Sequence, residues 1–172
     1  YLYAAKADKY DGRVHATPVR NVTLAMPEPV GILGVGCPDE YPLLGFVSTV
    51  IPAVAMGNTV IAVPSEKHPL AATDLYQVFE TSDLPGGVIN IITGNKDSLI
   101  QVLANHDAVD GIWFWGKKGV CGAIEEAAAA NMKRTWLSGG LYRDWMNPDH
   151  GEGDEFLRKA TEIKNIWVPY GE

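Results

Sequence analysis

Residues 29–63 read PVGILGVGCPDEYPLLGFVSTVIPAVAMGNTVIAV, and this stretch decides the fold. It contains two short apolar runs, at 30–35 and 59–63, separated by a mostly apolar segment of helical length at 43–56. The pair Gly57-Asn58 ends that segment, as expected where a helix gives way to a strand. A strand, a helix and a second strand in this order predict a parallel βαβ unit.

The same unit repeats toward the C-terminus. Further strands are expected at 88–92, 111–114 and 134–137, with helices at 70–80, 97–104 and 119–130. The strands are mostly apolar, as in parallel sheets that helices cover on both faces. We therefore predict an α/β fold with a doubly wound, five-stranded, Rossmann-like parallel sheet.

The two ends of the chain follow a different pattern. Residues 12–27 alternate loosely on either side of a Pro-Val-Arg-Asn break, and residues 163–168 alternate before Pro169 stops them. These segments predict a small antiparallel β-ribbon formed by the N- and C-terminal parts of the chain. Residues 141–155 (LYRDWMNPDHGEGDE) have no apolar period, so we expect an exposed loop there.

These patterns divide the chain into four segments. We predict a lead-in and ribbon at 1–28, a Rossmann-like domain of the nucleotide-binding type at 29–140, an acidic connector at 141–160 and a ribbon strand at 161–172. The first residue is Tyr1 rather than Met, which is consistent with a segment of a longer polypeptide. With 172 residues, of which 47% are hydrophobic, the chain has enough material for one core.

Composition and charge exclude several classes of partner. The formal net charge is -7 and no stretch is rich in Lys and Arg, so neither nucleic acid nor an anionic membrane is expected as a partner. No apolar stretch is long enough to span a membrane, and no signal peptide is visible. Two cysteines are weak evidence for a secreted disulfide scaffold, and we expect a cytoplasmic protein.

Two glycine-containing turns are candidate anion sites. The run at 31–36 (GILGVG) has the wrong order for a dinucleotide-binding turn, so close packing of the backbone explains its glycines better. Gly116-Lys117-Lys118-Gly119 lies between a predicted strand and a predicted helix, where the helix dipole favours an anion. Solvated lysines in a turn are an equally good explanation.

The other reactive side chains do not form a recognisable site. The four histidines have no metal-ligand spacing and are expected at the surface: His15, His68, His106 and His150. Near Cys37, the carboxylates of Asp39 and Glu40 would raise the pKa of the thiol, whereas Cys121 suits a buried, inert position. The carboxylates at 39–40 and 149–155 are interpreted as solvated charge.

A series of short motifs nevertheless runs in a familiar order. They are Pro29-Val30-Gly31, Ile51-Pro52-Ala53-Val54-Ala55-Met56-Gly57-Asn58-Thr59, Pro64-Ser65-Glu66, Leu84-Pro85-Gly86-Gly87-Val88-Ile89-Asn90, Thr93-Gly94, Phe114 with Gly116, Lys133-Arg134 and Gly139-Gly140. In this order they resemble the aldehyde dehydrogenase superfamily. The resemblance implies an NAD(P)-binding domain from an oxidoreductase that converts aldehydes to carboxylates.

The positions that carry the superfamily's chemistry are altered. Glu40 stands where the resemblance places the Asn that stabilises the oxyanion, and a carboxylate there would repel developing negative charge. Leu137 or Ser138 stands at the position of the general-base Glu. No cysteine follows Cys121, so the nucleophile is missing. The resemblance thus implies no catalytic residue in this segment.

The cofactor positions are also changed. Val63 replaces the Lys that would reach the adenosine ribose, and Trp115 could fill the cleft. The residues that the resemblance leaves for a nucleotide are Pro64, Ser65, Glu66, Gly116 and Lys117. We expect no cofactor and no metal, with NAD as the alternative.

The tail at 161–168 (TEIKNIWV) resembles the superfamily's C-terminal ribbon strand, and residues 7–12 resemble the segment before that ribbon. A connector thus replaces the catalytic domain, as in the truncated second module of aldehyde dehydrogenase family 16. We therefore predict a non-catalytic pseudoenzyme domain that serves assembly and docks by its ribbon on a catalytic dehydrogenase module. That module is expected in the same polypeptide, within a homo-oligomer. The alternative is the NAD(P)-binding portion of an active aldehyde dehydrogenase.

Overall fold

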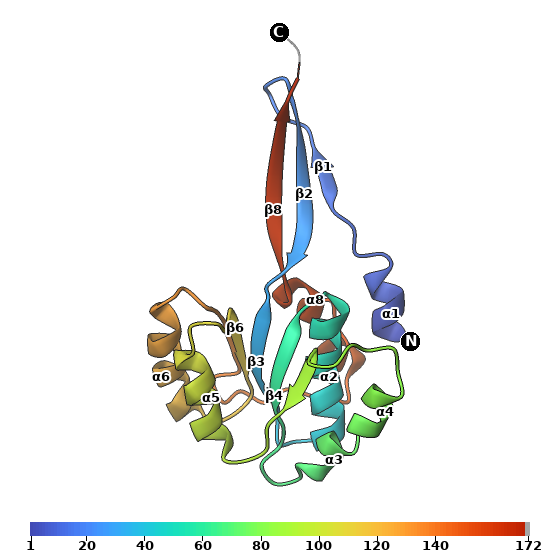
Figure 1. The fold of residues 1–172 in the computed structure, drawn as a ribbon. Coiled ribbons are helices and arrows are strands. Elements are labelled where there is room, and N and C mark those ends of the chain that lie inside the picture. The colour runs from blue at the N-terminus through green and yellow to red at the C-terminus, as the bar shows by residue number, and fades with distance from the viewer. Residues whose placement is uncertain (171–172) are drawn as a thin grey trace.

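The body of the molecule is built on a five-stranded parallel sheet, shown in the computed structural model of Figure 1, which describes residues 1–170. Its strand order is β5-β4-β3-β6-β7. The strands are β3 (Ile32–Gly36), β4 (Thr59–Val63), β5 (Ile89–Ile91), β6 (Gly111–Phe114) and β7 (Arg134–Leu137). The predicted doubly wound sheet is confirmed, and three of its five strands have the predicted bounds.

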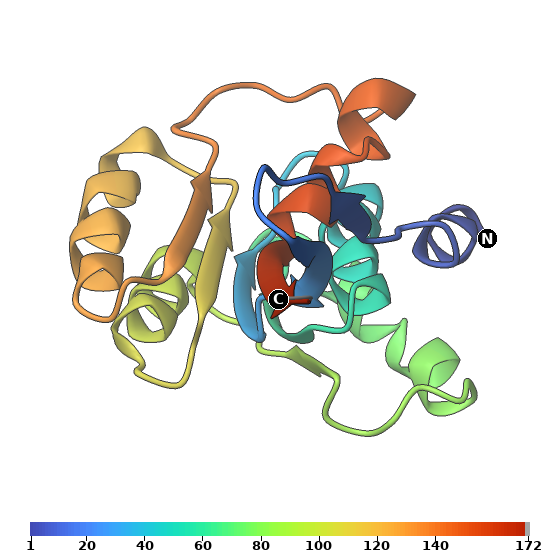
Figure 2. The same ribbon diagram turned by 90° about the horizontal axis from the view of Figure 1, so that it is seen from above.

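Helices cover both faces of this sheet. Helices α5 (Lys96–Asn105) and α6 (Lys118–Ala129) lie on one face, and α2 (Pro42–Ala55) lies on the other, as Figure 2 shows from above. Within residues 1–170, no helix has both the length and the apolar character needed to cross a bilayer. The helix expected at 70–80 is instead two short ones, α3 (Leu70–Thr73) and α4 (Tyr76–Glu80). Much of this segment is exposed, so little burial favours a continuous helix.

Alternate residues of the strands build a core on each face. Leu33 and Val35 of β3 point to the face covered by α2, whereas Gly34 and Gly36 point toward α5. A Cβ at Gly34 would lie 2.8 Å from Ile112 Cδ1, and one at Gly36 would lie 2.7 Å from a ring carbon of Phe114. The interpretation that these glycines permit close packing is confirmed.

The ribbon is a separate antiparallel sheet in the order β1-β2-β8. Its strands are β1 (Arg13–His15), β2 (Asn21–Pro29) and β8 (Thr161–Pro169), and a short helix, α1 (Leu2–Ala7), precedes them. β2 and β8 pair along nine residues, from Asn21 opposite Pro169 to Pro29 opposite Thr161. The predicted ribbon is confirmed, although residues 171–172 of the segment predicted at 161–172 lie outside the described residues.

The exposed loop expected at 141–155 is confirmed only in part, because much of the segment is exposed but it also holds a short helix and a buried tryptophan. The segment contains α7 (Pro148–Gly151) and leads into α8 (Glu155–Lys159), and Trp145 and Phe156 are buried against the α2 face of the sheet. A few large apolar side chains anchor this segment to the core without any periodic pattern in the sequence. Asn58 also holds the chain just after α8, because the Asn58 Nδ2 donates to the carbonyl oxygen of Ala160 at 2.8 Å.

Candidate functional site

The carboxyl ends of the parallel strands form a crevice at the point where the strand order reverses. The chain moves from β3 through β4 to β5 in one direction, and then adds β6 and β7 on the other side of β3. Open α/β sheets bind ligands at this switch point. A hollow of about 720 Å³ lies there, and its lining includes the predicted site residues Glu40, Glu66, Gly116, Lys117 and Ser138. We call this hollow the switch-point crevice.

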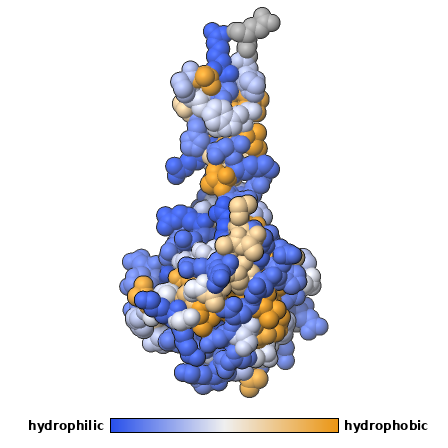
Figure 3. Space-filling view, turned by 90° about the vertical axis from the view of Figure 1, so that its left-hand side faces the viewer, coloured by the Kyte–Doolittle hydropathy of each residue, from blue (hydrophilic) through white to orange (hydrophobic). Residues whose placement is uncertain are grey.

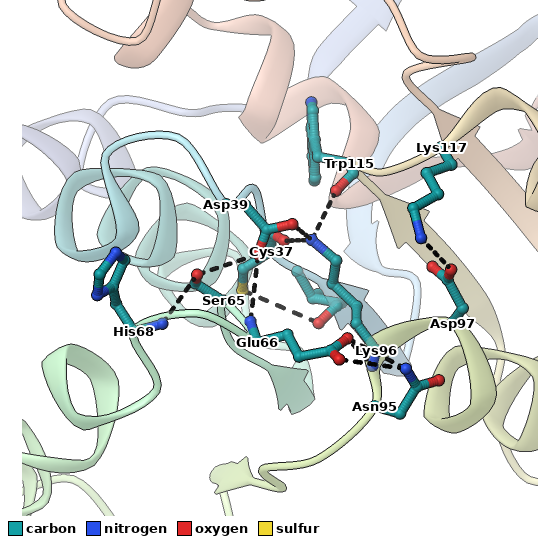
Figure 4. A network of polar contacts seen from close by, with 11 residues as sticks. Cys37, Asp39, Ser65, Glu66, His68, Asn95, Lys96, Asp97, Trp115 and Lys117 are labelled. Atoms are coloured by element: carbon teal, nitrogen blue, oxygen red, sulfur yellow. Dashed lines mark hydrogen bonds and ion pairs between the residues drawn. The ribbon is translucent and has the colours of Figure 1, made fainter.

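Lys96, the first residue of α5, lies within this crevice. Its Nζ donates to the carbonyl oxygens of Cys37 at 2.9 Å and Trp115 at 3.2 Å, and to Asp39 Oδ2 at 2.8 Å. An ammonium group has three protons, so all of them are used. Lys96 is only 3% exposed. Figure 4 shows its amine between the ends of β3 and β6, and sequence reasoning missed it.

Asp39 is the carboxylate partner of Lys96, rather than the solvated charge that the sequence suggested. Its Oδ1 accepts hydrogen bonds from Ser65 Oγ at 3.0 Å and from the Glu66 backbone N–H at 3.2 Å. Partial burial raises the pKa of this carboxyl, but the hydrogen bond and charge of Lys96 outweigh burial and hold the pKa below its ordinary value. Asp39 is therefore held in the charged form.

Glu66 is tied to the start of α5. Its carboxylate accepts hydrogen bonds from Asn95 Nδ2 at 3.2 Å and 3.3 Å, and from the Lys96 backbone N–H at 3.1 Å. Asn95 in turn caps α5, because its Oδ1 accepts a hydrogen bond from the Ser98 backbone N–H at 3.0 Å. Both oxygens of Glu66 thus already have protein partners.

The turn before α6 brings Gly116 and Lys117 to the crevice. Lys117 Nζ lies 3.3 Å from Asp97 Oδ2, and the lysine side chain is 83% exposed. Pro64 and Ser65 are buried and do not line the crevice, although they were predicted with this group, and Val63 is buried in the core. Of the five predicted nucleotide contacts, the structure therefore gathers only Glu66, Gly116 and Lys117 around the crevice.

The positions predicted to have lost catalytic groups lie at the same edge. Leu137 packs against the core under α5 and α6, while Ser138 and Glu40 line the crevice. Cys37 is fully buried, and burial is the largest cause that raises the pKa of its thiol to about 12; Asp39 adds to that rise. Cys121 is also buried, as expected. Both thiols are therefore shielded from solvent.

An aromatic cluster next to the crevice was also missed. Trp113, Trp115, Trp136, Trp145 and Phe156 contact one another, and the Arg143 guanidinium lies 4.8 Å from the centre of the Phe156 ring. Trp113 and Trp136 lie on β6 and β7, Trp115 directly follows β6 and Trp145 follows β7, so no local pattern links them. All four histidines are exposed, as expected. Across residues 1–170, no group of His, Cys, Asp and Glu side chains is arranged to hold a metal ion.

One signal in the sequence pointed to Lys96. A lysine in the first turn of a helix opposes the helix dipole, so a cation at that position needs another reason. The N-cap Asn95 identifies this position from the sequence alone. The burial of Lys96 and its three acceptors depend on how the strand ends meet.

Comparison with known proteins gives a consistent result. The model of the aldehyde dehydrogenase family matches residues 1–141. The NADP/NAD-dependent aldehyde dehydrogenase PuuC of Escherichia coli is 37% identical over 139 residues, and retinal dehydrogenase 2 of Homo sapiens is 36% identical over 136 residues. These matches cover 80% and 78% of this chain, but only 28% and 26% of the relatives.

Solved structures agree with the sequence matches. PnpE from Pseudomonas sp. WBC-3, described also in complex with nicotinamide adenine dinucleotide, superposes with a TM-score of 0.75 at 30% identity. The match covers 79% of this chain and 28% of that one. An indole-3-acetaldehyde dehydrogenase in its apo form has a TM-score of 0.75 at 34% identity, covering 82% of this chain and 34% of its own.

Proposed function

This chain belongs to the aldehyde dehydrogenase family, and from that premise we propose that it is a non-catalytic member whose ribbon assembles with a catalytic dehydrogenase module. The observation that carries the proposal is an apolar face on the ribbon. Residues directly opposite each other in an antiparallel sheet share a face. The register places six apolar residues on one side, which we call the apolar face: Val14, Val22, Leu24, Met26, Ile166 and Val168.

This apolar face is open to solvent. Val14 is 72% exposed, and Val22, Met26 and Val168 are also exposed. Figure 1 shows the ribbon projecting from the body, and Figure 3 shows hydrophobic patches along it. A small sheet needs an apolar face that packs against something, and exposed clusters of this kind mark interaction sites. A partner that covers this face would supply the missing packing.

The ribbon also offers a strand edge. β8 pairs with β2 on one side, and it forms the outer strand of the sheet order β1-β2-β8. An unpaired edge of nine residues can pair with a strand of another molecule. We take the partner to be a dehydrogenase module, in the same polypeptide or in a homo-oligomer, because the chain spans about a quarter to a third of its relatives' lengths.

The family's cofactor, NAD(P), fits this chain poorly. A dinucleotide needs donors for its phosphates and an acceptor for its ribose hydroxyls, yet Lys117 is paired with Asp97, and Glu66 already accepts hydrogen bonds from Asn95 and Lys96. Glu40, which also lines the crevice, would repel a pyrophosphate. The proposed role therefore does not use NAD(P).

The described residues also do not favour catalysis by this chain. Acyl transfer through a thiol needs a reactive thiolate and a base close to it. Cys37 is buried with a raised pKa, and Leu137 and Ser138 offer no carboxylate at the end of β7. These features favour a structural role over turnover.

A second candidate is the NAD(P)-binding portion of an active aldehyde dehydrogenase. The observation that favours it is the switch-point crevice, which lies where nucleotides bind in related folds. That candidate requires NAD binding in the crevice, and the non-catalytic proposal does not.

The test of the assembly proposal uses single substitutions on the two faces of the ribbon. Val168→Lys, and separately Val22→Lys, place a charge on the apolar face, whereas Trp167→Lys places one on the opposite face, where Trp167 is 59% exposed. In the natural polypeptide that contains this chain, we expect light scattering to show a smaller assembly for the apolar-face variants only. Intact mass and peptide mapping of that polypeptide test whether it contains a dehydrogenase module.

Each other outcome has a definite meaning. An unchanged assembly mass in both apolar-face variants would contradict the proposal, and a loss confined to Trp167→Lys would assign docking to the other face. A dimer of the isolated chain that Val168→Lys abolishes would assign the apolar face to a second copy instead.

A further inference from the structure

We propose that Lys96 blocks dinucleotide binding from the lining of the switch-point crevice, because its internal ion pair with Asp39 takes up the contacts at the strand ends that a dinucleotide would otherwise use. The inference deepens the proposed non-catalytic function and rests on it. It concerns this chain's own residues, and it explains how a nucleotide-binding fold keeps its shape without a nucleotide.

The Lys96 amine lies between the ends of two neighbouring strands. The two carbonyl groups that it contacts belong to Cys37, directly after β3, and to Trp115, directly after β6. These two strands are neighbours in the sheet and flank the point where the strand order reverses. The amine therefore bridges the two strand ends between which a ligand would enter.

Hydrogen bonds around Lys96 link the other strand ends to the start of α5. Asp39 links the end of β3 to Ser65 and Glu66 after β4, and Glu66 links that segment to Asn95 and Lys96 at the start of α5. The ends of β3, β4 and β6 and the start of α5 are thus joined by protein contacts alone, as Figure 4 shows. No external ligand is needed to satisfy these groups.

Displacing Lys96 from this network would cost free energy. A dinucleotide that displaced the Lys96 side chain would break three hydrogen bonds and leave Asp39 without its cation. Separating the partners of a shielded ion pair is costly, because the charge left behind loses its compensation. The pyrophosphate would then face Asp39, Glu40 and Glu66, which raises that cost further.

The experiment compares NAD binding before and after removal of the ion pair. Lys96→Ala combined with Asp39→Asn removes both charges together and shortens the lysine side chain in the lining of the crevice. Lys117→Ala is the matched control, because Lys117 is a cation on the rim of the same crevice but is exposed. Calorimetric titration of the full chain with NAD should show no binding for the unaltered chain or for Lys117→Ala.

The double variant should bind NAD measurably, at roughly tenfold or more above the detection limit that the unaltered chain does not reach. Circular dichroism checks that it is folded. A folded double variant that gains no affinity would overturn the proposal, and so would NAD binding by the unaltered chain.

Amine acetylation of the unaltered chain keeps the proposal testable if the double variant does not fold. Peptide mapping should find Lys96 unmodified while Lys117 and Lys118 are modified, and added NAD should leave this pattern unchanged. A Lys96 that NAD exposes to acetylation would contradict the proposal. Failure of this proposal is distinguishable from failure of the assembly proposal, because the ribbon variants do not touch the crevice.

Discussion

The charge state of Asp39 depends on its neighbours more than on its own exposure. Burial alone would favour the neutral carboxyl, but Lys96, Ser65 and the Glu66 backbone all favour the carboxylate. A carboxyl whose pKa is lower in the folded chain than in the unfolded chain stabilises the fold above its unfolded pKa. That stabilisation is lost as the pH falls through the lower, folded pKa.

Asp39→Asn should therefore lower the stability of the fold at neutral pH. It should also make that stability depend less on pH in the acid range. We expect the free energy of unfolding to fall by about 1–2 kcal/mol near pH 7, since a partly exposed pair is worth less than a fully buried one. Below an ordinary pKa of 3.8, the unaltered chain should lose stability more steeply than the variant. Urea unfolding at a series of pH values measures both effects.

Asp97→Asn is the matched control for that measurement. Asp97 also pairs with a lysine at the crevice, but Lys117 is largely exposed, so little change in stability is expected. If Asp39→Asn and Asp97→Asn gave the same pH profile, the special role assigned to Asp39 would be wrong.

At the scale of elements, the short helix α8 joins the body to the ribbon. It carries two buried residues, Phe156 and Leu157, and it ends directly before β8. Phe156 contacts Trp136 with ring centres 5.1 Å apart, and it also packs near Trp113, Trp115 and Trp145. A helix of five residues has little stability of its own, so this packing holds it in place.

Phe156→Ala should remove that anchor. We expect the free energy of unfolding to fall by about 3–5 kcal/mol, the usual cost of deleting a fully buried phenylalanine ring. Arg158→Ala on the exposed side of the same helix should change it by less than about 0.5 kcal/mol. Denaturant unfolding followed by tryptophan fluorescence measures both, and equal losses in the two variants would contradict the anchoring role.

At the scale of the whole molecule, the chain combines a complete sheet core with a ribbon that has no core of its own. The body buries apolar side chains on both faces of its sheet, whereas the ribbon leaves its apolar face exposed. The body thus has the fold of the family, and under the non-catalytic proposal it lacks the groups that the family's chemistry requires. This separation of fold from function is common, because function depends on particular side chains placed on a fold.

The isolated chain should accordingly form no NADH from NAD and an aldehyde. The physical reason is that both thiols are buried, burial raises the pKa of the Cys37 thiol, and β7 ends without a carboxylate base. Absorbance of NADH measures turnover, with PuuC of Escherichia coli as the positive control. NADH formation that Cys37→Ser or Cys121→Ser abolishes would refute the non-catalytic proposal.

The sequence by itself determined the local elements and their order. Apolar runs, glycine turns and caps are local features, so they identified the five parallel strands, the three longest helices and the ribbon. Ordered motifs also identified the family, and they predict that its catalytic positions are altered. Residue types at fixed spacings are enough for these conclusions, because they do not depend on distances between remote segments.

Only the tertiary structure decided which residues share a site. The amine of Lys96 meets groups that lie 59 and 19 positions away along the chain, and Asn58 reaches Ala160 across 102 positions. The burial of Trp145 and Phe156 likewise depends on rings from β6, from the residue after it and from β7. Long-range packing sets these contacts, and a single sequence carries no local pattern for it. For that reason the crevice was predicted from its glycines and lysines, while the ion pair in its lining was not.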